Sequence, residues 1–128
     1  MNTPLFRVLQ KIIVIAIIML LIDGVYLTLA KGHFAKVVRS IQKTDMKVDI
    51  WGAILSYAAL VIGFYWFVSS RNGSLLDAMM LGWVIYFVFD GTNRAMFKNY
   101  GWDTVLLDGV WGGLLFGLVW MTLRILKL

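Results

Sequence analysis

The chain has 128 residues, of which 61% are hydrophobic, and its mean hydropathy is +0.83. A soluble globular domain is about 45–50% apolar, so this composition predicts a small integral membrane protein without a separate soluble domain. The absence of cysteine excludes disulfides and thiolate metal sites. The net charge is +5, and the basic residues lie between apolar blocks, where we expect them to face anionic headgroups rather than a nucleic-acid partner.

Four apolar blocks have the length of membrane-spanning helices, about 20 residues each. We predict spans over about 8–30, 50–69, 76–95 and 104–123. No A-x-A-like cleavage site clearly follows the first block, so we interpret it as a retained span rather than a signal peptide. All four must be helical, because an open strand in lipid leaves backbone groups unpaired. The expected fold is an all-α membrane four-helix bundle, a single domain over residues 1–128.

A weak internal repeat relates the two halves of the chain. Asp23-Gly24 is echoed by Asp90-Gly91, and the segment 49–52 (Asp-Ile-Trp-Gly) is echoed by 108–112 (Asp-Gly-Val-Trp-Gly). The spans could therefore form two tandem helical hairpins related by an axis along the membrane normal. Coincidence in a chain of few residue types explains the pattern equally well.

The segment 31–49 differs from the spans by its basic charge. Its apolar residues recur at i, i+3, i+4 and i+7: Phe34, Val37, Val38 and Ile41. Another face carries Lys36, Arg39 and Lys43. This pattern is typical of an amphipathic helix in the headgroup plane, whose cations contact anionic lipids, and a plain basic loop is the alternative. In either case we expect His33 to be solvated.

Positive charge gives a weak prediction of orientation. The loops after spans one and three hold seven basic residues, and the opposite side holds five. The positive-inside bias places the first side in the cytoplasm. Because the two sides differ by only two basic residues, insertion in both orientations is the alternative.

Three aspartates, each followed by glycine, interrupt the apolar segments: Asp23, Asp90 and Asp108. From the helical rise, they lie about 5, 6 and 9 Å from the middles of their spans, all toward the loops after spans one and three. If the three helices face one another, these carboxylates form one acidic cluster in one half of the bilayer. A charge at such depth is costly unless it is paired, protonated or hydrated.

Polar and aromatic side chains lie within one helical turn of these acids: Tyr26, Tyr86, Asn93, Arg94 and Trp111. Three carboxylates against one arginine leave negative charge, so the cluster should hold a proton, a cation or a cationic ligand. Asp23, Asp90 and Asp108 could hold a hard ion such as Mg²⁺ or Ca²⁺, but we favour a site without metal, and we expect no cofactor.

A structural role is the alternative for the same residues. Asp90 would pair with Arg94, and Asp108 would cap the start of span four. Asp49, Asp77 and Asp103 lie at span starts, where we expect helix N-caps.

Small residues at four-residue spacing predict close helix packing. Span four carries Gly109, Gly113 and Gly117, and span two carries Gly52 and Ser56 on a similar stripe. Such stripes let helix backbones approach each other. We favour packing within the monomer over homo-oligomerisation, which remains the alternative.

The segments 89–93 (Phe-Asp-Gly-Thr-Asn) and 108–112 (Asp-Gly-Val-Trp-Gly) resemble a domain-of-unknown-function family. It comprises small predicted four-pass membrane proteins of bacteria and some large DNA viruses, with Tyr-Asp-x-Thr-Asn on helix three and Asp-x-x-Trp-Gly on helix four. Its Asp-x-x-Trp-Leu-like segment on helix one is matched by residues 23–27. This chain departs from the family at Phe89, usually Tyr, and at Tyr26, usually Trp. The resemblance implies four spans and an Asp/Asn/Trp cluster, and no established activity.

These patterns favour a membrane protein that binds or transports a proton, a cation, or a small ligand that is either cationic or lipid-like. A structural protein of a cellular or viral envelope is the alternative. A third hypothesis is an enzyme in which two aspartates act as acid and base on a lipid-soluble substrate. We favour a non-enzymatic function, because the sequence offers no nucleophile constellation, phosphate loop or thiol.

Overall fold

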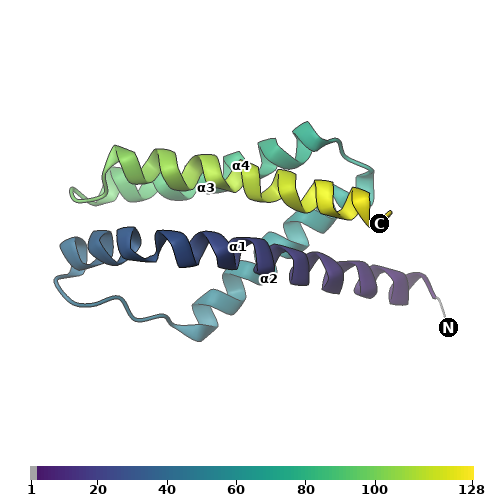
Figure 1. Cartoon of the computed structure of the whole chain (residues 1–128), viewed down its shortest axis with the longest axis horizontal. Helices are drawn as coiled ribbons and strands as arrows, with labels where there is room; N and C mark the ends of the chain where they lie inside the picture. Colours follow the sequence, from purple (N-terminus) through teal and green to yellow (C-terminus); the bar gives the residue numbers. More distant parts are fainter. Residues whose placement is uncertain (1–2) are drawn as a thin grey trace.

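The computed structural model describes residues 3–128, which form four α-helices and one short 3₁₀ turn (Figure 1). The elements follow in the order α1 (Pro4–Gln42), α2 (Ile50–Phe67), η1 (Ser69–Arg71), α3 (Leu75–Met96) and α4 (Trp102–Ile125). Four helical segments are long and apolar enough to cross a membrane. The expectation of an all-α membrane fold is thus confirmed.

Helix α1 is much longer than a membrane span. Thr3 caps its start by accepting from the Phe6 amide at 3.1 Å, and Pro4 occupies the first turn, where a missing N–H costs nothing. Its 39 residues extend about 58 Å, against a hydrocarbon core of about 30 Å. The helix therefore projects well beyond the bilayer.

Residues 31–42 continue α1 instead of forming a separate helix in the headgroup plane or a loop. No proline interrupts the segment, and the helix ends at Lys43, the C-cap, which has a left-handed backbone (φ 64°). Only residues 43–49 are non-helical. The Asn99 side chain donates to the Ser40 carbonyl at 2.8 Å, which ties this extension to the loop after α3.

The helix starts agree only partly with the expected caps. Asp49 caps α2 by accepting from the Trp51 amide at 2.9 Å. At α3 the cap is Ser74, whose hydroxyl accepts from the Asp77 amide, and the Asp77 carboxylate accepts from the Ser74 amide, which completes a capping box. Asp103 is not a cap, because α4 begins one residue earlier, after Gly101.

Helix α4 is the centre of the packing. It forms a tight antiparallel hairpin with α3, and α1 packs against both α4 and α2, whereas α2 scarcely touches α3 (Figure 1). In the apolar window of α4, 56% of the residues are buried inside the protein, against 11% for α2. The two halves of the chain therefore differ, since only α3 and α4 form a compact hairpin.

Glycines on α4 allow the close approach of α3. A Cβ at Gly113 would lie 2.0 Å from the Trp83 indole nitrogen, and one at Gly82 would lie 2.1 Å from the Gly112 carbonyl oxygen. The stripe of Gly109, Gly113 and Gly117 is thus filled by side chains of α3, which is packing within the monomer. The stripe on α2 differs, because Gly52 and Ser56 remain exposed.

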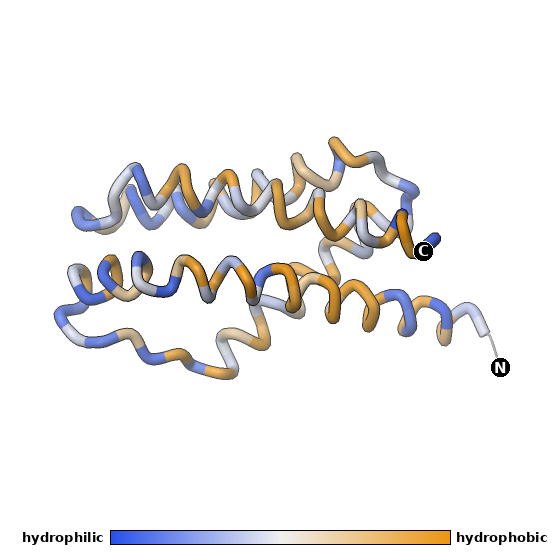
Figure 2. The backbone as a smooth tube through the Cα atoms, viewed as in Figure 1, coloured by the Kyte–Doolittle hydropathy of each residue, from blue (hydrophilic) through white to orange (hydrophobic). Residues whose placement is uncertain are grey.

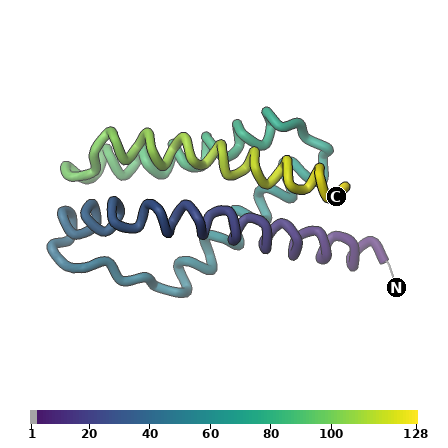
Figure 3. The backbone as a smooth tube through the Cα atoms, viewed as in Figure 1, coloured from purple at the N-terminus to yellow at the C-terminus, as the bar shows by residue number. Residues whose placement is uncertain are grey.

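The distribution of polarity fits a membrane protein. Figure 2 shows a mainly apolar central part of the molecule and hydrophilic segments toward both ends. Helix α1 begins and α4 ends at the same end of the molecule (Figure 3). The core between the helices includes Ile15, Met19, Phe64 and Phe116, all fully buried.

Candidate functional site

The three intramembrane aspartates are buried side chains of three different helices. Asp23 on α1 is 5% exposed, Asp90 on α3 is 0% exposed, and Asp108 on α4 is 7% exposed. Each accepts a hydrogen bond from an aromatic side chain of another segment of the chain. Water cannot take over these bonds, so the protein itself must satisfy the carboxyl groups.

Helices α1 and α4 are joined by a reciprocal pair of hydrogen bonds. Tyr26 on α1 donates its hydroxyl to Asp108 Oδ1 at 2.9 Å, and Trp111 on α4 donates its indole N–H to Asp23 Oδ1 at 2.8 Å. On each helix the aromatic residue comes three positions after the acid, so both share one face. Each helix therefore offers one acceptor and one donor to the other.

The two aromatic donors also stack on each other. The rings of Tyr26 and Trp111 are 4.6 Å apart and nearly parallel, with 6° between their planes. Stacked aromatic pairs contribute about 0.5–1.5 kcal/mol beyond their buried area. We call these four side chains (Asp23, Tyr26, Asp108 and Trp111) the clasp.

Helix α2 reaches the clasp through Tyr57. Its hydroxyl donates to Asp23 Oδ2, the oxygen that Trp111 does not use. Both oxygens of Asp23 thus have a donor. This carboxyl group is fully engaged in linking three helices.

Asp90 is engaged on one side only. Its Oδ1 accepts from the Tyr100 hydroxyl, whereas its Oδ2 is buried and has no hydrogen-bond partner among residues 3–128. The carboxyl group of Asp108 lies beside it. Two neighbouring carboxyl groups out of water cannot both ionise without a large penalty, so this pair has room for one proton or one cation.

Tyr100 lies in the loop between α3 and α4 and is 5% exposed. Burial, together with the hydrogen bond to Asp90, raises the pKa of the Tyr100 hydroxyl above its ordinary value. The hydroxyl therefore remains a donor to Asp90 at neutral pH. Through this bond the loop closes the end of the acidic cluster.

Arg94 does not neutralise Asp90, contrary to the expected pair. Its guanidinium group donates to the Tyr100 carbonyl at 3.0 Å and lies over the Trp102 ring, 5.3 Å from its centre. Both partners belong to the loop and to the first turn of α4, so the cation is held away from the buried acid. Asn93 lies near the Tyr100 hydroxyl.

Asp108 is not a helix cap, because α4 begins at Trp102, almost two turns earlier. It is one of the residues that line a groove of about 390 Å³ between α2 and α3. The groove is otherwise mostly apolar and is lined by Ser56, Ala59, Leu60, Ile85, Tyr86 and Phe89. Tyr86 thus lies at the expected place, with its ring against Gly112.

The three carboxylates do not surround one point. Among residues 3–128, no group of three acidic, histidine or cysteine side chains is arranged to hold a metal ion. Asp23 and Asp108 are each bonded to one member of the stacked Tyr26 and Trp111 pair. This arrangement of the described residues does not provide the three-carboxylate geometry of the Mg²⁺ or Ca²⁺ site that the sequence left as a less favoured possibility.

His33 is a further departure from the expected solvated loop. Its Nε2 lies 2.7 Å from the hydroxyl of Thr104, which is 1% exposed, and 3.9 Å from Asp103. Because residues 31–42 continue α1, His33 lies against the first turn of α4. Its contact adds to the clasp in joining these two helices.

Sequence reasoning missed Tyr57 and Tyr100 as partners of the acids. A depth calculation would have found Tyr57, which lies about 10 Å along α2 from the same side of the membrane. The reciprocal clasp also has a signal, since residues 23–25 and 108–110 share Asp-Gly-Val followed by an aromatic donor. No sequence pattern indicates the role of Tyr100, because that role depends on the conformation of a loop.

Comparison with known proteins gives one match. A family model described as a predicted membrane protein, DUF2177, matches residues 8–123. The match spans all four helices and every member of the acidic cluster. No curated protein and no solved structure matches the chain.

Proposed function

We propose that this chain, which belongs to the DUF2177 family of predicted membrane proteins, binds a small lipid-soluble cation at Asp90 and Asp108. The empty pair holds a proton, which leaves when the cation binds. The ligand class therefore consists of organic cations with an apolar body. Four apolar helices and family membership place the site in an integral membrane protein.

The groove between α2 and α3 is the observation that carries this proposal. Its lining is mostly apolar, and it reaches a buried carboxyl group, Asp108. An apolar cleft with a few polar groups at one point is the usual form of a small-molecule site. Because α2 scarcely touches α3, the cleft opens sideways between helices, so a ligand dissolved in the bilayer could enter it.

The unpartnered oxygen of Asp90 supplies the charge that the ligand would neutralise. A buried polar atom without a partner is destabilising unless a proton or a ligand satisfies it. Within residues 3–128, no basic side chain forms an ion pair with Asp90 or Asp108, and Arg94 donates to the loop instead. A cation entering the groove meets negative charge in a medium of low dielectric constant, where attraction is strong.

Binding of tetraphenylphosphonium to the purified protein in nanodiscs tests the proposal. This probe is apolar and positively charged, and tetraphenylborate is an anionic control of the same shape. We expect saturable binding of the cation only, with release of protons into a weakly buffered medium. Equal binding of both probes would contradict the proposal, because partition into lipid would explain it.

Two variants locate the site, and one controls for charge. Asp108→Asn removes the acid that lines the groove, and Ala59→Leu fills the groove without changing a hydrogen bond. We expect each to weaken binding about tenfold or more. Asp103→Asn removes an exposed acid from the same helix and should have no effect. Unchanged affinity in both groove variants would refute the assignment.

A purely structural role is a second candidate, and the clasp favours it. Every oxygen of Asp23 is engaged in holding helices together. If this were the whole function, Asp90→Asn would change stability without removing any ligand-dependent signal. Flux of tetraphenylphosphonium into liposomes, compared between Asp90→Asn and the native chain, then separates transport and binding from a scaffold.

A further inference from the structure

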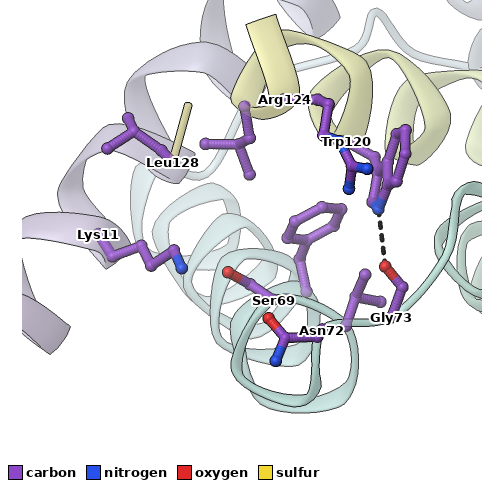
Figure 4. Close-up of a pocket in the computed structure, with 10 residues that line it drawn as sticks. Lys11, Ser69, Asn72, Gly73, Trp120, Arg124 and Leu128 are labelled. Carbon is purple, nitrogen blue, oxygen red and sulfur yellow. Dashed lines mark hydrogen bonds between the residues drawn. The ribbon is translucent and has the colours of Figure 1, made fainter. Parts of the chain in front are cut away.

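The opposite end of the molecule carries a basic groove that takes no part in the acidic site. Figure 4 shows Lys11 of α1 and Arg124 of α4 on two sides of this space, with Ser69 and Asn72 on a third. The cavity is about 100 Å³. It adjoins a groove of about 280 Å³ that shares Lys11, Ser69 and Asn72 and adds Arg7.

No acidic side chain among residues 3–128 neutralises the charges of this groove, whose lining also includes Leu128. No acidic side chain lines either cavity. Neither Lys11 nor Arg124 forms an ion pair with a carboxylate side chain in the part of the chain that the structure describes. Two cations that converge without a counterion favour an anionic ligand between them.

The groove is also held in shape. Trp120 donates its indole N–H to the Gly73 carbonyl at 2.8 Å, which fixes the turn after η1 to α4 (Figure 4). The Arg124 guanidinium group lies over the Trp120 ring, 5.1 Å from its centre, and Asn72 adopts a left-handed backbone with φ 51°. These contacts hold the turn and Arg124 in place before any ligand arrives, which lowers the entropic cost of binding.

The depth of the groove matches a lipid headgroup. Lys11 directly precedes the uninterrupted apolar run 12–22, and Arg124 follows the apolar face of α4. Both cations therefore lie where the hydrocarbon ends. Exposed apolar side chains such as Leu9 and Phe67 occur on the helices that frame the groove and offer contacts to acyl chains.

We propose that this basic groove binds the phosphate group of an anionic phospholipid. Lys11 and Arg124 contact the phosphate oxygens, and Ser69 and Asn72 donate further hydrogen bonds to the headgroup. The proposal is independent of the acidic site, which lies toward the other end of the helices.

Native mass spectrometry of the protein in detergent with added phosphatidylglycerol or phosphatidylcholine tests this inference. We expect preferential retention of phosphatidylglycerol, weakened about tenfold in the double variant Lys11→Gln, Arg124→Gln. The control Lys31→Gln, Lys98→Gln removes the same charge from exposed positions at the other end and should leave retention unchanged. Helicity by circular dichroism verifies folding, and Lys11→Gln alone serves if the double variant does not fold.

Two results would overturn the proposal. Equal losses in the two double variants would mean that net charge, and not this groove, retains the lipid. Displacement of phosphatidylglycerol by millimolar inorganic phosphate would show that the groove takes free phosphate, and would refute the lipid assignment.

Discussion

The bond from Tyr57 to Asp23 should carry an unusual share of the attachment of α2. This helix is the least buried of the four, with 11% of its apolar window inside the protein. Tyr57 provides its only side-chain hydrogen bond to another helix among the described residues. Tyr57→Phe removes the hydroxyl and leaves the ring, so it isolates that bond.

The expected loss follows from the surroundings of Asp23. The carboxyl group is 5% exposed, so water cannot replace the donor, and Trp111 alone remains to satisfy it. Hydrogen bonds to charged groups contribute about 1.5–3 kcal/mol in soluble proteins, whereas side-chain bonds between membrane helices average about 0.6 and reach about 1.7 kcal/mol. We expect a coupling free energy of about 1–2 kcal/mol between the two side chains.

Reversible unfolding in mixed micelles, in a double-mutant cycle, measures this coupling. The cycle combines Tyr57→Phe and Asp23→Asn singly and together. Tyr65→Phe is the matched control, because Tyr65 lies on the same helix and makes no side-chain hydrogen bond among residues 3–128. A coupling below about 0.3 kcal/mol, or equal destabilisation by Tyr65→Phe, would refute the reasoning.

Four further variants test the helix packing, a helix cap and the surface. Gly82→Ala should destabilise the packing of α3 on α4 by about 1–3 kcal/mol, because the new Cβ would lie 2.1 Å from a backbone carbonyl oxygen. At Gly91 an added Cβ would have no neighbour within 4 Å, so Gly91→Ala should be neutral or stabilising in the same unfolding assay. Ser74→Ala should lower unfolding free energy by about 1 kcal/mol through loss of the capping box, an effect absent if the cap is not formed. Asp45→Asn, which breaks an exposed ion pair, should change stability by less than about 1 kcal/mol, and a larger change would show that this pair is not simply solvated.

The four spans could be predicted because each is an apolar block of membrane length, and lipid leaves helix as the only open choice. The length of α1 could not be predicted in this way. Charge and amphipathic spacing after Ala30 indicate a change of environment, but backbone continuity depends on what the extension contacts. Here His33 meets Thr104, and Asn99 bonds to Ser40, so tertiary contacts keep the helix straight past the apolar block.

At the acidic site, depth along each helix can be calculated from the sequence because helical rise is nearly constant, and all three acids are buried. The hydrogen-bond partners of the acids were predicted less well. Arg94 shares a helical face with Asp90, but it contacts the Tyr100 carbonyl of the loop and the Trp102 ring of α4. The buried acid accepts from the Tyr100 hydroxyl instead. Spacing within one helix gives the candidates, and only the packing of the helices selects among them.

The clasp shows how such a selection can be built into a sequence. An acid and an aromatic donor three residues apart lie on one face of a helix. When α1 and α4 carry the same spacing and run antiparallel, each acid meets the other helix's donor, and the two donors are brought together to stack. Oδ1 of Asp108 and Oδ1 of Asp23 then each have a donor from the other helix, and Tyr57 of α2 supplies the donor to Oδ2 of Asp23. Asp90 lies outside this exchange, because its Oδ1 accepts from Tyr100 and its buried Oδ2 has no hydrogen-bond partner among residues 3–128.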